Sequence, residues 1–403
     1  MKCTPEEVIQ YVEEENVKFI RLAFCDVYGQ QKNLSIMPGE LRRAFSQGMA
    51  FDASAIAGFG GAVRSDLFLR PDSATLAGLP WRPENGRVVR MFCGITRPDG
   101  SVFEADTRHL LQQAIEDAQN LGYSFSFGAE MEFYLFKTDE NGEPTQEPYD
   151  HAGYMDIAPA DKGENVRREI CLTLEQMGIR PESSHHEEGP GQNEIDFRYS
   201  DALTSADDAI TFRSVVQTIA ARSGLWADFS PKPLSGQPGS GLHINLSVHG
   251  PDGSDPMPQV LAGILRHAYD LTAFCNPCRD SYRRLGSSKA PGYITWSSEN
   301  RSQLIRLPAA QGEYRRLELR SPDPTANPYI AFALLIWAGL DGIVRDLPLP
   351  PSADLNLYEA PAQVLASFRR LPATLEEAQS AAAKSPFIRS HLPAAILSAY
   401  TQA

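Results

Sequence analysis

A chain of 403 residues exceeds the ~100–200 residues of a typical single domain, so two domains are expected. Acidic residues outnumber lysine and arginine by 51 to 37, which gives a formal net charge of −14. No basic run suggests a nucleic acid or an anionic membrane as a partner, so small molecules or other protein chains are the expected partners.

The N-terminal segment, residues 1–17, is acidic and lacks the apolar stretch of a signal peptide, so it predicts an amphipathic helix. The longest apolar run, residues 329–340, is shorter than the ~20 residues of a membrane helix and predicts a buried helix. Six cysteines are scattered along the chain, and the single pair Cys275 and Cys278 lacks the partners of a zinc site. We therefore expect a soluble, cytoplasmic protein with reduced thiols.

The character of the chain changes near residue 100. Short strand-like runs with Gly/Pro-rich connections precede this point, and longer elements follow it. We therefore predict an N-terminal domain over residues 1–100 and a larger domain over residues 101–403. In the larger domain, the spacing predicts helices over 107–122 and 163–178, a strand over 123–136, and a helix with Ser205 as its N-cap. Alternating strands and helices indicate an α+β or α/β fold.

Two segments place carboxylates at strand spacing. Glu130 and Glu132 are separated by one residue, so both side chains point to the same face of a strand. Adjacent carboxylates repel each other, so this face is either solvated or occupied by a cation. Further along, the same period groups Arg316, Glu318 and Arg320, a pattern that also fits a surface ladder of ion pairs.

A third segment, residues 239–248, combines glycines with polar side chains. Gly239 permits close approach of the backbone to a ligand. His243, Asn245 and Ser247 then share one face of the following strand. A lone histidine on a strand is more often structural than a ligand, so this segment alone leaves both interpretations open.

The fourth segment, residues 183–196, contains two histidines and several acids around a Gly-Pro-Gly turn. The turn can bring Glu187 and Glu194 to one point. Hard cations such as Mg²⁺ and Mn²⁺ prefer carboxylate oxygens, and arginines beside them suit a phosphate or carboxylate substrate. The chain has no GxxxxGK[ST] loop, and GFGG at 58–61 is a weak dinucleotide signal. These residues indicate a metal-dependent site for a phosphate or carboxylate substrate.

These segments, in this order, resemble the class I glutamine synthetase family. The resemblance rests on stretches such as GAEMEFYLF, SHHEEGPGQNEIDFRY, GSGLHINLSV, NRSQLIRLP and RLELRSPDPTANPYIAFALL, and it covers nearly the whole chain. It implies an α+β fold with an N-terminal β-grasp domain and a C-terminal catalytic domain that carries a curved antiparallel sheet. It also implies a homo-oligomer, a hexameric ring or double ring, with active sites between neighbouring subunits.

The resemblance also implies roles for individual residues. It assigns one Mg²⁺ or Mn²⁺ ion to Glu132, Glu187 and Glu194, and a second to Glu130, His243 and Glu318. It assigns glutamate to Gly239, Arg284, Asn245 and Arg320, and the phosphates of ATP to Ser247, Arg301, Arg306 and Arg316. It places Asp52, Asp66, Arg301, Arg320 and Lys289 at catalytic positions. Asp52 and Asp66 match acids around the ammonium ion, and Asp52 would reach in from the adjacent subunit.

The implied reaction is the ATP-dependent ligation of ammonia to the γ-carboxylate of L-glutamate. ATP first phosphorylates this carboxylate, and metal ions and arginines spread the charge of the transfer. Ammonia then displaces phosphate from γ-glutamyl phosphate, and acids around the ammonium ion accept its proton. This is the chemistry of glutamine biosynthesis in nitrogen metabolism.

Lys289 departs from the family pattern, because the family carries a flap glutamate immediately before Ala-Pro. An ammonium side chain cannot accept a proton, and it repels a bound ammonium ion at about 4 Å by roughly 4 kcal/mol at an effective dielectric near 20. Pro238 also replaces an asparagine that usually precedes the glutamate-binding glycine. The alternatives are a γ-glutamyl ligase for another amine and a weakly active or regulatory relative.

The C-terminus ends where the family continues into a helical tail that clasps two rings. A weakened double ring or a single hexamer is therefore expected. The nitrogen acceptor, the preferred metal and any feedback regulators stay open at this point.

Overall fold

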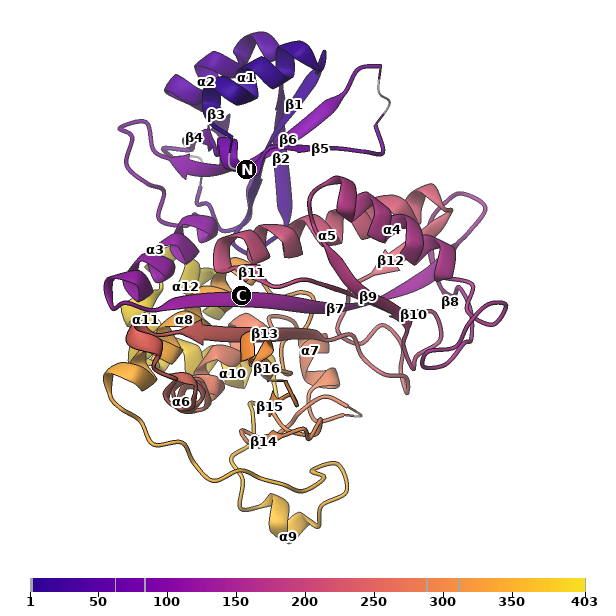
Figure 1. The fold of residues 1–403 in the computed structure, drawn as a ribbon, viewed down its shortest axis with the longest axis vertical. Helices are drawn as coiled ribbons and strands as arrows, with labels where there is room; N and C mark the ends of the chain where they lie inside the picture. The colour runs from indigo at the N-terminus through magenta and orange to yellow at the C-terminus, as the bar shows by residue number, and fades with distance from the viewer. Residues whose placement is uncertain (1–2, 62, 83–84, 288, 311, 403) are drawn as a thin grey trace.

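The computed structural model describes residues 3–61, 63–82, 85–287, 289–310 and 312–402 (Figure 1). Within these described residues, two sheets organise the fold, one with six strands and one with ten. The first sheet lies in the upper part of Figure 1, and the second crosses the middle of the molecule.

The first sheet has the strand order β2-β1-β6-β4-β3, with β5 paired to β6. Strands β1 and β6 run parallel, and the other neighbours are antiparallel. Helix α1 begins after Thr4, which forms a capping box with Glu7 and confirms the expected N-terminal helix. The elements are α1 (Pro5–Glu14), β1 (Phe19–Cys25), β2 (Gln31–Ile36), α2 (Leu41–Gln47), β3 (Met49–Asp52), β4 (Asp66–Pro71), β5 (Ala77–Gly78) and β6 (Val88–Thr96).

The second sheet has the order β14-β15-β16-β13-β7-β10-β9, and β8, β11 and β12 also pair with the long strand β7. It is antiparallel except for the pair β14 and β15. The first elements of this part of the chain are α3 (Thr107–Asn120), β7 (Ser124–Thr138), β8 (Pro144–Pro148), α4 (Glu164–Gln176), β9 (Pro181–His186), β10 (Gln192–Phe197), β11 (Ser200–Asp201), α5 (Ala202–Arg222), β12 (Leu225–Asp228) and β13 (Leu242–His249). The two predicted helices over 107–122 and 163–178 and the predicted strand over 123–136 are confirmed.

The remaining elements are mostly helical. They are α6 (Met257–Cys275), α7 (Arg279–Arg284), β14 (Trp296–Ser298), β15 (Ile305–Leu307), β16 (Leu317–Leu319), α8 (Pro328–Val344), α9 (Ala362–Leu365), α10 (Leu375–Lys384), α11 (Pro386–His391) and α12 (Ala394–Thr401). Helix α8 contains the apolar run and packs against α3, α5 and α6, so it is buried as expected. In the described part of the chain, no helix combines the length and the hydropathy needed to cross a membrane.

The start of α5 differs from the expectation. The N-cap is Asp201, whose side chain accepts a hydrogen bond from the Thr204 amide. Ser205 lies inside the helix and is buried, so its prediction as N-cap was wrong. Both residues are good caps, and the choice is set by β11, which ends at Asp201 beside β7.

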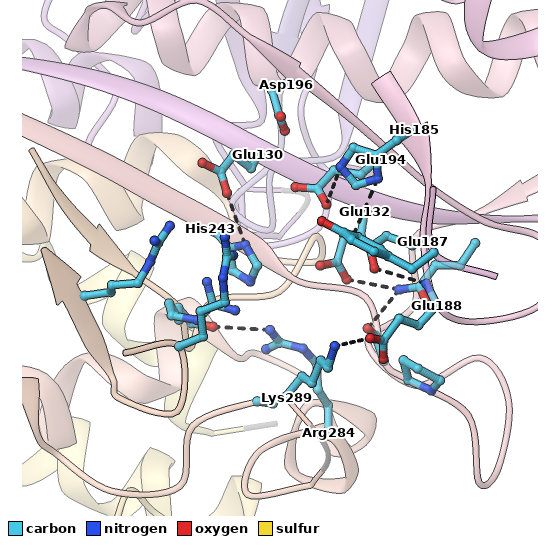
Figure 2. Close-up of a pocket in the computed structure, with 18 of the residues that line it drawn as sticks. Glu130, Glu132, His185, Glu187, Glu188, Glu194, Asp196, His243, Arg284 and Lys289 are labelled. Carbon is cyan, nitrogen blue, oxygen red and sulfur yellow. Dashed lines mark hydrogen bonds and ion pairs between the residues drawn. The ribbon is translucent and has the colours of Figure 1, made fainter. Parts of the chain in front are cut away.

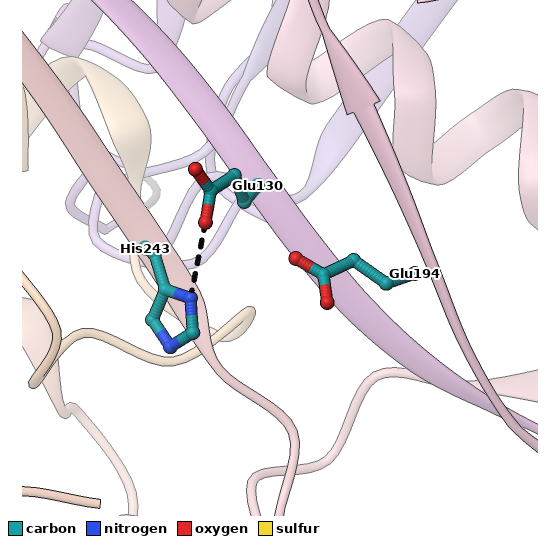
Figure 3. A group of neighbouring side chains, drawn as sticks. All are labelled: Glu130, Glu194 and His243. Atoms are coloured by element: carbon teal, nitrogen blue, oxygen red, sulfur yellow. Dashed lines mark hydrogen bonds and ion pairs between the residues drawn. The ribbon is translucent and has the colours of Figure 1, made fainter. Parts of the chain in front are cut away.

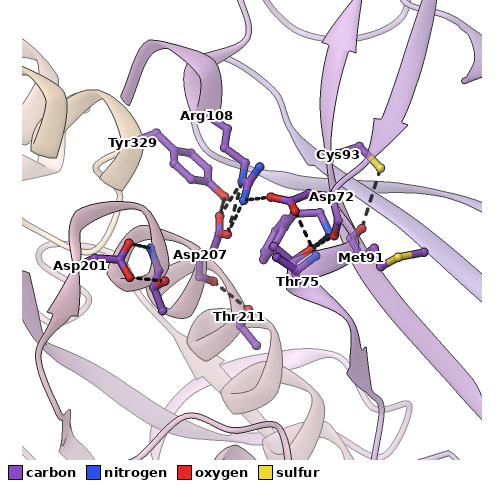
Figure 4. Close-up of polar contacts among 12 residues, drawn as sticks. Asp72, Thr75, Met91, Cys93, Arg108, Asp201, Asp207, Thr211 and Tyr329 are labelled. Atoms are coloured by element: carbon purple, nitrogen blue, oxygen red, sulfur yellow. Dashed lines mark hydrogen bonds and ion pairs between the residues drawn. The ribbon is translucent and has the colours of Figure 1, made fainter. Parts of the chain in front are cut away.

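A buried ion-pair network joins the two sheets. Arg108 of α3 lies 2.9 Å from Asp207 of α5 and 2.9 Å from Asp72, which follows β4 (Figure 4). Tyr329 donates a hydrogen bond of 2.6 Å to Asp207. Burial alone lowers the pKa of Arg108, but the charges of Asp207 and Asp72 hold this pKa well above its usual value. The N-terminal sheet is thus tied to the helices that pack on β7.

Candidate active site

Strand register brings acidic side chains from different parts of the chain together. On β7 and β10, Glu132 lies opposite Glu194, and Glu130 lies opposite Asp196. On β13, His243 lies opposite Glu130. Because side chains alternate along a strand, all five point to the same face of the sheet.

These side chains line a cavity of about 470 Å³ (Figure 2). Its other wall is basic and consists of Arg284, Lys289, Arg301, Arg306, Arg316 and Arg320. A second cavity of about 250 Å³ shares Glu130, Asp196 and Arg316 with the first, and Asn245 and Ser247 line it as well. Glu130 and Asp196 therefore lie between the two cavities, and Glu132 faces the first, so these carboxylates do not form the solvated outer face that was considered for Glu130 and Glu132.

Glu130 is held in its ionised form. His243 Nδ1 lies 3.3 Å from Glu130 Oε2, and Asn245 Nδ2 donates to Oε1 at 2.7 Å. Burial opposes ionisation, but the contacts with His243 and Asn245 lower the pKa of Glu130 to about 2. This carboxylate is therefore negative at neutral pH.

The neighbouring carboxylates crowd one another. Burial raises the pKa of Glu132, and the Glu187 charge adds to this effect even though the Gly241 amide donates to Glu132 at 2.8 Å. Burial and the Glu132 charge raise the pKa of Glu194 well above its usual value. Burial and the Glu130 charge raise the pKa of Asp196 to about 6. A divalent cation among these groups would relieve their repulsion.

Two groups of side chains can hold such a cation. Ligand atoms of Glu130, Glu194 and His243 all lie within 4.8 Å of one another (Figure 3), as do those of His185, Glu187 and Glu194. The carboxylate-rich donor set fits a hard divalent ion. Glu194 belongs to both groups, whereas the expected assignment placed it only with Glu132 and Glu187 and did not include His185 as a ligand.

Glu318 belongs to neither group and forms ion pairs with two arginines. It is fully buried, forms an ion pair with Arg320, and accepts a hydrogen bond of 2.5 Å from Arg306 Nε. His243 Nδ1 lies 3.8 Å from Glu318, so this carboxylate stays next to the cluster. The surface ladder considered for this strand is therefore a buried set of ion pairs at the cavity.

The residues expected to bind glutamate gather beside the acidic cluster. A Cβ atom added at Gly239 would lie 2.3 Å from the Pro231 carbonyl oxygen and 2.9 Å from Arg284, so only glycine fits there. Arg284 donates to the carbonyl of Ser321 at 2.7 Å and lines the cavity. Arg316 Nε donates to Asn245 Oδ1 at 2.8 Å, which connects the two cavities.

Asp52 and Asp66 lie elsewhere on this chain. They pair with each other at the ends of β3 and β4, and both are exposed. Neither belongs to the described lining of the two cavities. The contribution of Asp52 to an adjacent subunit stays a prediction.

Lys289 does reach the cavity. Its ammonium group forms an ion pair with Glu188, and both side chains line the cavity (Figure 2). Lys289 has a φ of 63°, a left-handed conformation that is uncommon outside glycine. The pair connects the loop after α7 with the turn after β9.

A buried polar network fixes the turn that carries Glu187. Asp150 Oδ1 lies 2.8 Å from His186 Nε2 and accepts from the Gly191 amide at 3.1 Å. Asn193 donates to the Gly191 carbonyl at 2.9 Å. Asp150, Asp161 and His186 have the spacing of metal ligands, but Arg167 already pairs with Asp161 inside the cluster. This group therefore positions the turn, and the guanidinium supplies the positive charge.

Several lining residues were not identified from the sequence, including Asp196, Tyr154, Glu188 and Gln192. Asp196 follows Glu194 by two positions on a strand, so alternation alone could have found it. Tyr154 comes from an irregular segment and meets His185 edge to face, with ring centroids 5.4 Å apart. No local sequence pattern predicts that Tyr154 lies at the site.

A carboxylate cluster facing an arginine wall on a curved antiparallel sheet defines an enzyme that handles anionic substrates with a divalent cation. Two family models match the chain. "Glutamine synthetase, beta-Grasp domain" matches residues 16–98, and "Glutamine synthetase, catalytic domain" matches residues 104–403. The chain belongs to the glutamine synthetase family and is a ligase of that type, dependent on ATP and a divalent metal.

Curated relatives and solved structures agree with this assignment. Glutamine synthetase from Clostridium saccharobutylicum is 46% identical over 371 residues, which cover 89% of this chain and 84% of the relative. Glutamine synthetase from Methanosarcina mazei is 43% identical over 415 residues, covering 99% and 93%. The structures "GmaS/ADP complex-Conformation 1" and "Apo GmaS without ligand" superpose with TM-scores of 0.89 and 0.88 at 28% identity, covering 100% and 98% of this chain and 94% of each structure. The expected β-grasp and catalytic architecture is confirmed.

Proposed function

We propose that this chain ligates ammonia to the γ-carboxylate of L-glutamate at the expense of ATP, with γ-glutamyl phosphate as intermediate. The observation that carries the proposal is the cavity of about 470 Å³ in which crowded carboxylates face an arginine wall. The carboxylates suit a divalent ion, and the arginines suit the anionic groups of glutamate and ATP.

In this proposal, one ion is held by Glu132, Glu187 and Glu194, and another by Glu130, His243 and Glu318. Mg²⁺ or Mn²⁺, when bound, would offset negative charge on the phosphoryl oxygens of ATP. The grouping seen here adds His185 to the first set as a candidate ligand, because its Nδ1 lies 3.7 Å from Glu187.

The arginines divide the anionic parts of the substrates among them. Arg284 and Gly239 receive the glutamate carboxylate, together with Arg320 and Asn245. Arg301, Arg306, Arg316 and Ser247 receive the phosphates, and fixed guanidinium groups stabilise charge that develops during transfer. Asp52 and Asp66 accept the ammonium proton at a site shared with a neighbouring subunit of a ring-shaped homo-oligomer.

The test is phosphate release from ATP by the purified chain with glutamate and Mg²⁺ or Mn²⁺, with and without ammonium. We expect release to require ammonium and to match glutamine formation mole for mole. Phosphate release that is indifferent to ammonium, with no glutamine formed, would refute the proposal.

A second candidate is ligation of another amine to glutamate, and Lys289 is the observation that favours it. Its charge lies in the cavity lining, where it disfavours a small cation such as ammonium. A panel of primary amines tests this, beside Lys289→Glu and the control Lys384→Glu, which makes the same charge change on an exposed residue of α10. Faster turnover with a larger amine, or ammonium use only by Lys289→Glu, would select this candidate. If the protein binds ATP but turns over no amine, the third alternative, a weakly active or regulatory relative, is the one supported.

A further inference from the structure

A basic groove lies between the N-terminal sheet and helix α5, on residues that the proposed reaction does not use. Its volume is about 690 Å³, and five of its lining residues are cationic: Arg21, Lys32, Arg82, Arg90 and Arg222. Among the lining residues that the structure describes, none is acidic. Such a concentration of positive charge is unexpected in a chain with a net charge of −14.

The floor of the groove holds two arginines side by side. Arg21 of β1 and Arg90 of β6 are register partners in the parallel pair of strands. Arg90 is 7% exposed, donates to Thr211 Oγ1 of α5 at 3.1 Å, and stacks over the Phe92 ring at 4.0 Å. The Arg90 guanidinium is therefore fixed in place before any ligand arrives.

Arg21 and Arg82 repel each other, whereas Asp207 and Asp208 partly balance the charge of Arg90. Burial lowers the pKa of Arg21, and the charge of Arg82 lowers it further. Within the described residues, neither Arg21 nor Arg82 has a carboxylate partner, whereas Lys32 lies 3.7 Å from Asp26. Arg222 donates to the Trp81 carbonyl at 3.0 Å. Like charges held close together cost free energy unless an anion lies between them.

The rest of the lining suits a small polar molecule. Gln31, Asn33, Gln217 and Thr218 add hydrogen-bonding groups, and Trp81 adds an aromatic side. The volume falls in the range of about 300–1,000 Å³ that small-molecule sites occupy. We propose that this groove binds a small polyvalent anion, whose carboxylate or phosphate groups are received by Arg21, Arg82 and Arg90.

Such an anion would touch both halves of the molecule. Strands β1, β2 and β6 provide one side of the groove, and α5 provides the other. Phe212 of α5 packs edge to face on Phe133 of β7, with ring centroids 6.2 Å apart, beside Glu132 of the acidic cluster. The ligand would therefore contact the helix that supports the metal-binding strand.

Calorimetric titration of the metal-free full-length protein tests the proposal. Citrate probes carboxylate chemistry, and pyrophosphate probes phosphate chemistry. Working without metal prevents chelation and makes the readout independent of catalysis. The groove variant is Arg21→Gln with Arg82→Gln. The control is Arg42→Gln with Arg43→Gln, which removes the same charge from exposed arginines of α2.

We expect the wild type and the control to bind one of the probes alike, and the groove variant to bind it at least tenfold more weakly. The groove variant should melt no lower than the wild type without ligand, since it loses a repulsion. If it melts lower, Arg82→Gln alone, at an exposed residue, replaces it and is expected to weaken binding as well. Any of three results would overturn the proposal. The groove variant could bind as tightly as the wild type, the control could weaken binding equally, or neither probe could bind at millimolar concentration.

Discussion

Glu188 and Lys289 meet at the cavity from two loops that are far apart in the sequence. Their side chains are 35% and 58% exposed, so the pair contributes no more than ~1 kcal/mol. We predict that Glu188→Gln and Lys289→Gln each raise the KM for glutamate by ~2–5-fold, because each loosens the loop over the bound substrate.

The charge-swapped variant, Glu188→Lys with Lys289→Glu, separates two roles for this pair. If the pair acts by joining the loops, the swap restores the KM in steady-state kinetics. Should the swapped protein be worse than both single variants, Lys289 contacts substrate directly, and the connecting role is wrong.

At the scale of elements, the turn between β9 and β10 depends on the buried carboxylate of Asp150. That carboxylate accepts hydrogen bonds from the Gly191 and Lys162 amides at 3.1 and 2.9 Å and contacts His186. Asp150→Asn replaces one acceptor with a donor, so a buried amide loses its partner at a cost of ~1–3 kcal/mol. We predict at least tenfold weaker Mn²⁺ binding, measured by electron paramagnetic resonance, because the turn carries Glu187.

Asp139→Asn is the matched control for Asp150→Asn. Asp139 also accepts two backbone amides in a turn, from Asn141 and Glu143, but it is exposed and distant from the cluster. It should leave Mn²⁺ affinity unchanged. Unchanged Mn²⁺ affinity in a folded Asp150→Asn protein would show that the network does not position the turn.

The same elements show how far the sequence predicts the site. Alternation along β7 correctly placed Glu130 and Glu132 on one face, because that pattern is local. The meeting of Glu130 with Glu194 and His243 depends on the register of β10, β7 and β13, and no local pattern encodes it. The family resemblance supplied most of the remaining lining residues. It did not supply Glu188, because this residue matters through its contact with Lys289 across the cavity.

At the scale of the molecule, Arg108 joins the N-terminal sheet to the catalytic part. We predict that Arg108→Gln lowers the free energy of unfolding by ~3–5 kcal/mol, because it leaves the Asp207 carboxylate buried without its cation. Urea denaturation at a fixed protein concentration measures this. The control Arg97→Gln breaks a more exposed pair with Glu104 and should cost less than ~1 kcal/mol. Similar losses for the two variants would contradict a special role for the buried network.

Asp208 of α5, next to Asp207 of this network, makes stability depend on pH. Burial and the charge of Asp207 raise the pKa of Asp208 from 3.8 to about 7, with Arg90 opposing and Asp201 adding to the shift. The folded protein then binds this proton more tightly than the unfolded chain, so this carboxyl lowers stability as pH rises from about 4 to 7 and has its full effect above pH 7. Asp208→Asn removes the effect. Urea unfolding should therefore show a variant more stable than wild type by more than ~1 kcal/mol at pH 8, and this gain should be clearly smaller at pH 4.5. The exposed Glu116→Gln should show no such trend, and a gain for Asp208→Asn that is equal at both pH values would mean that the proton of Asp208 is not its source.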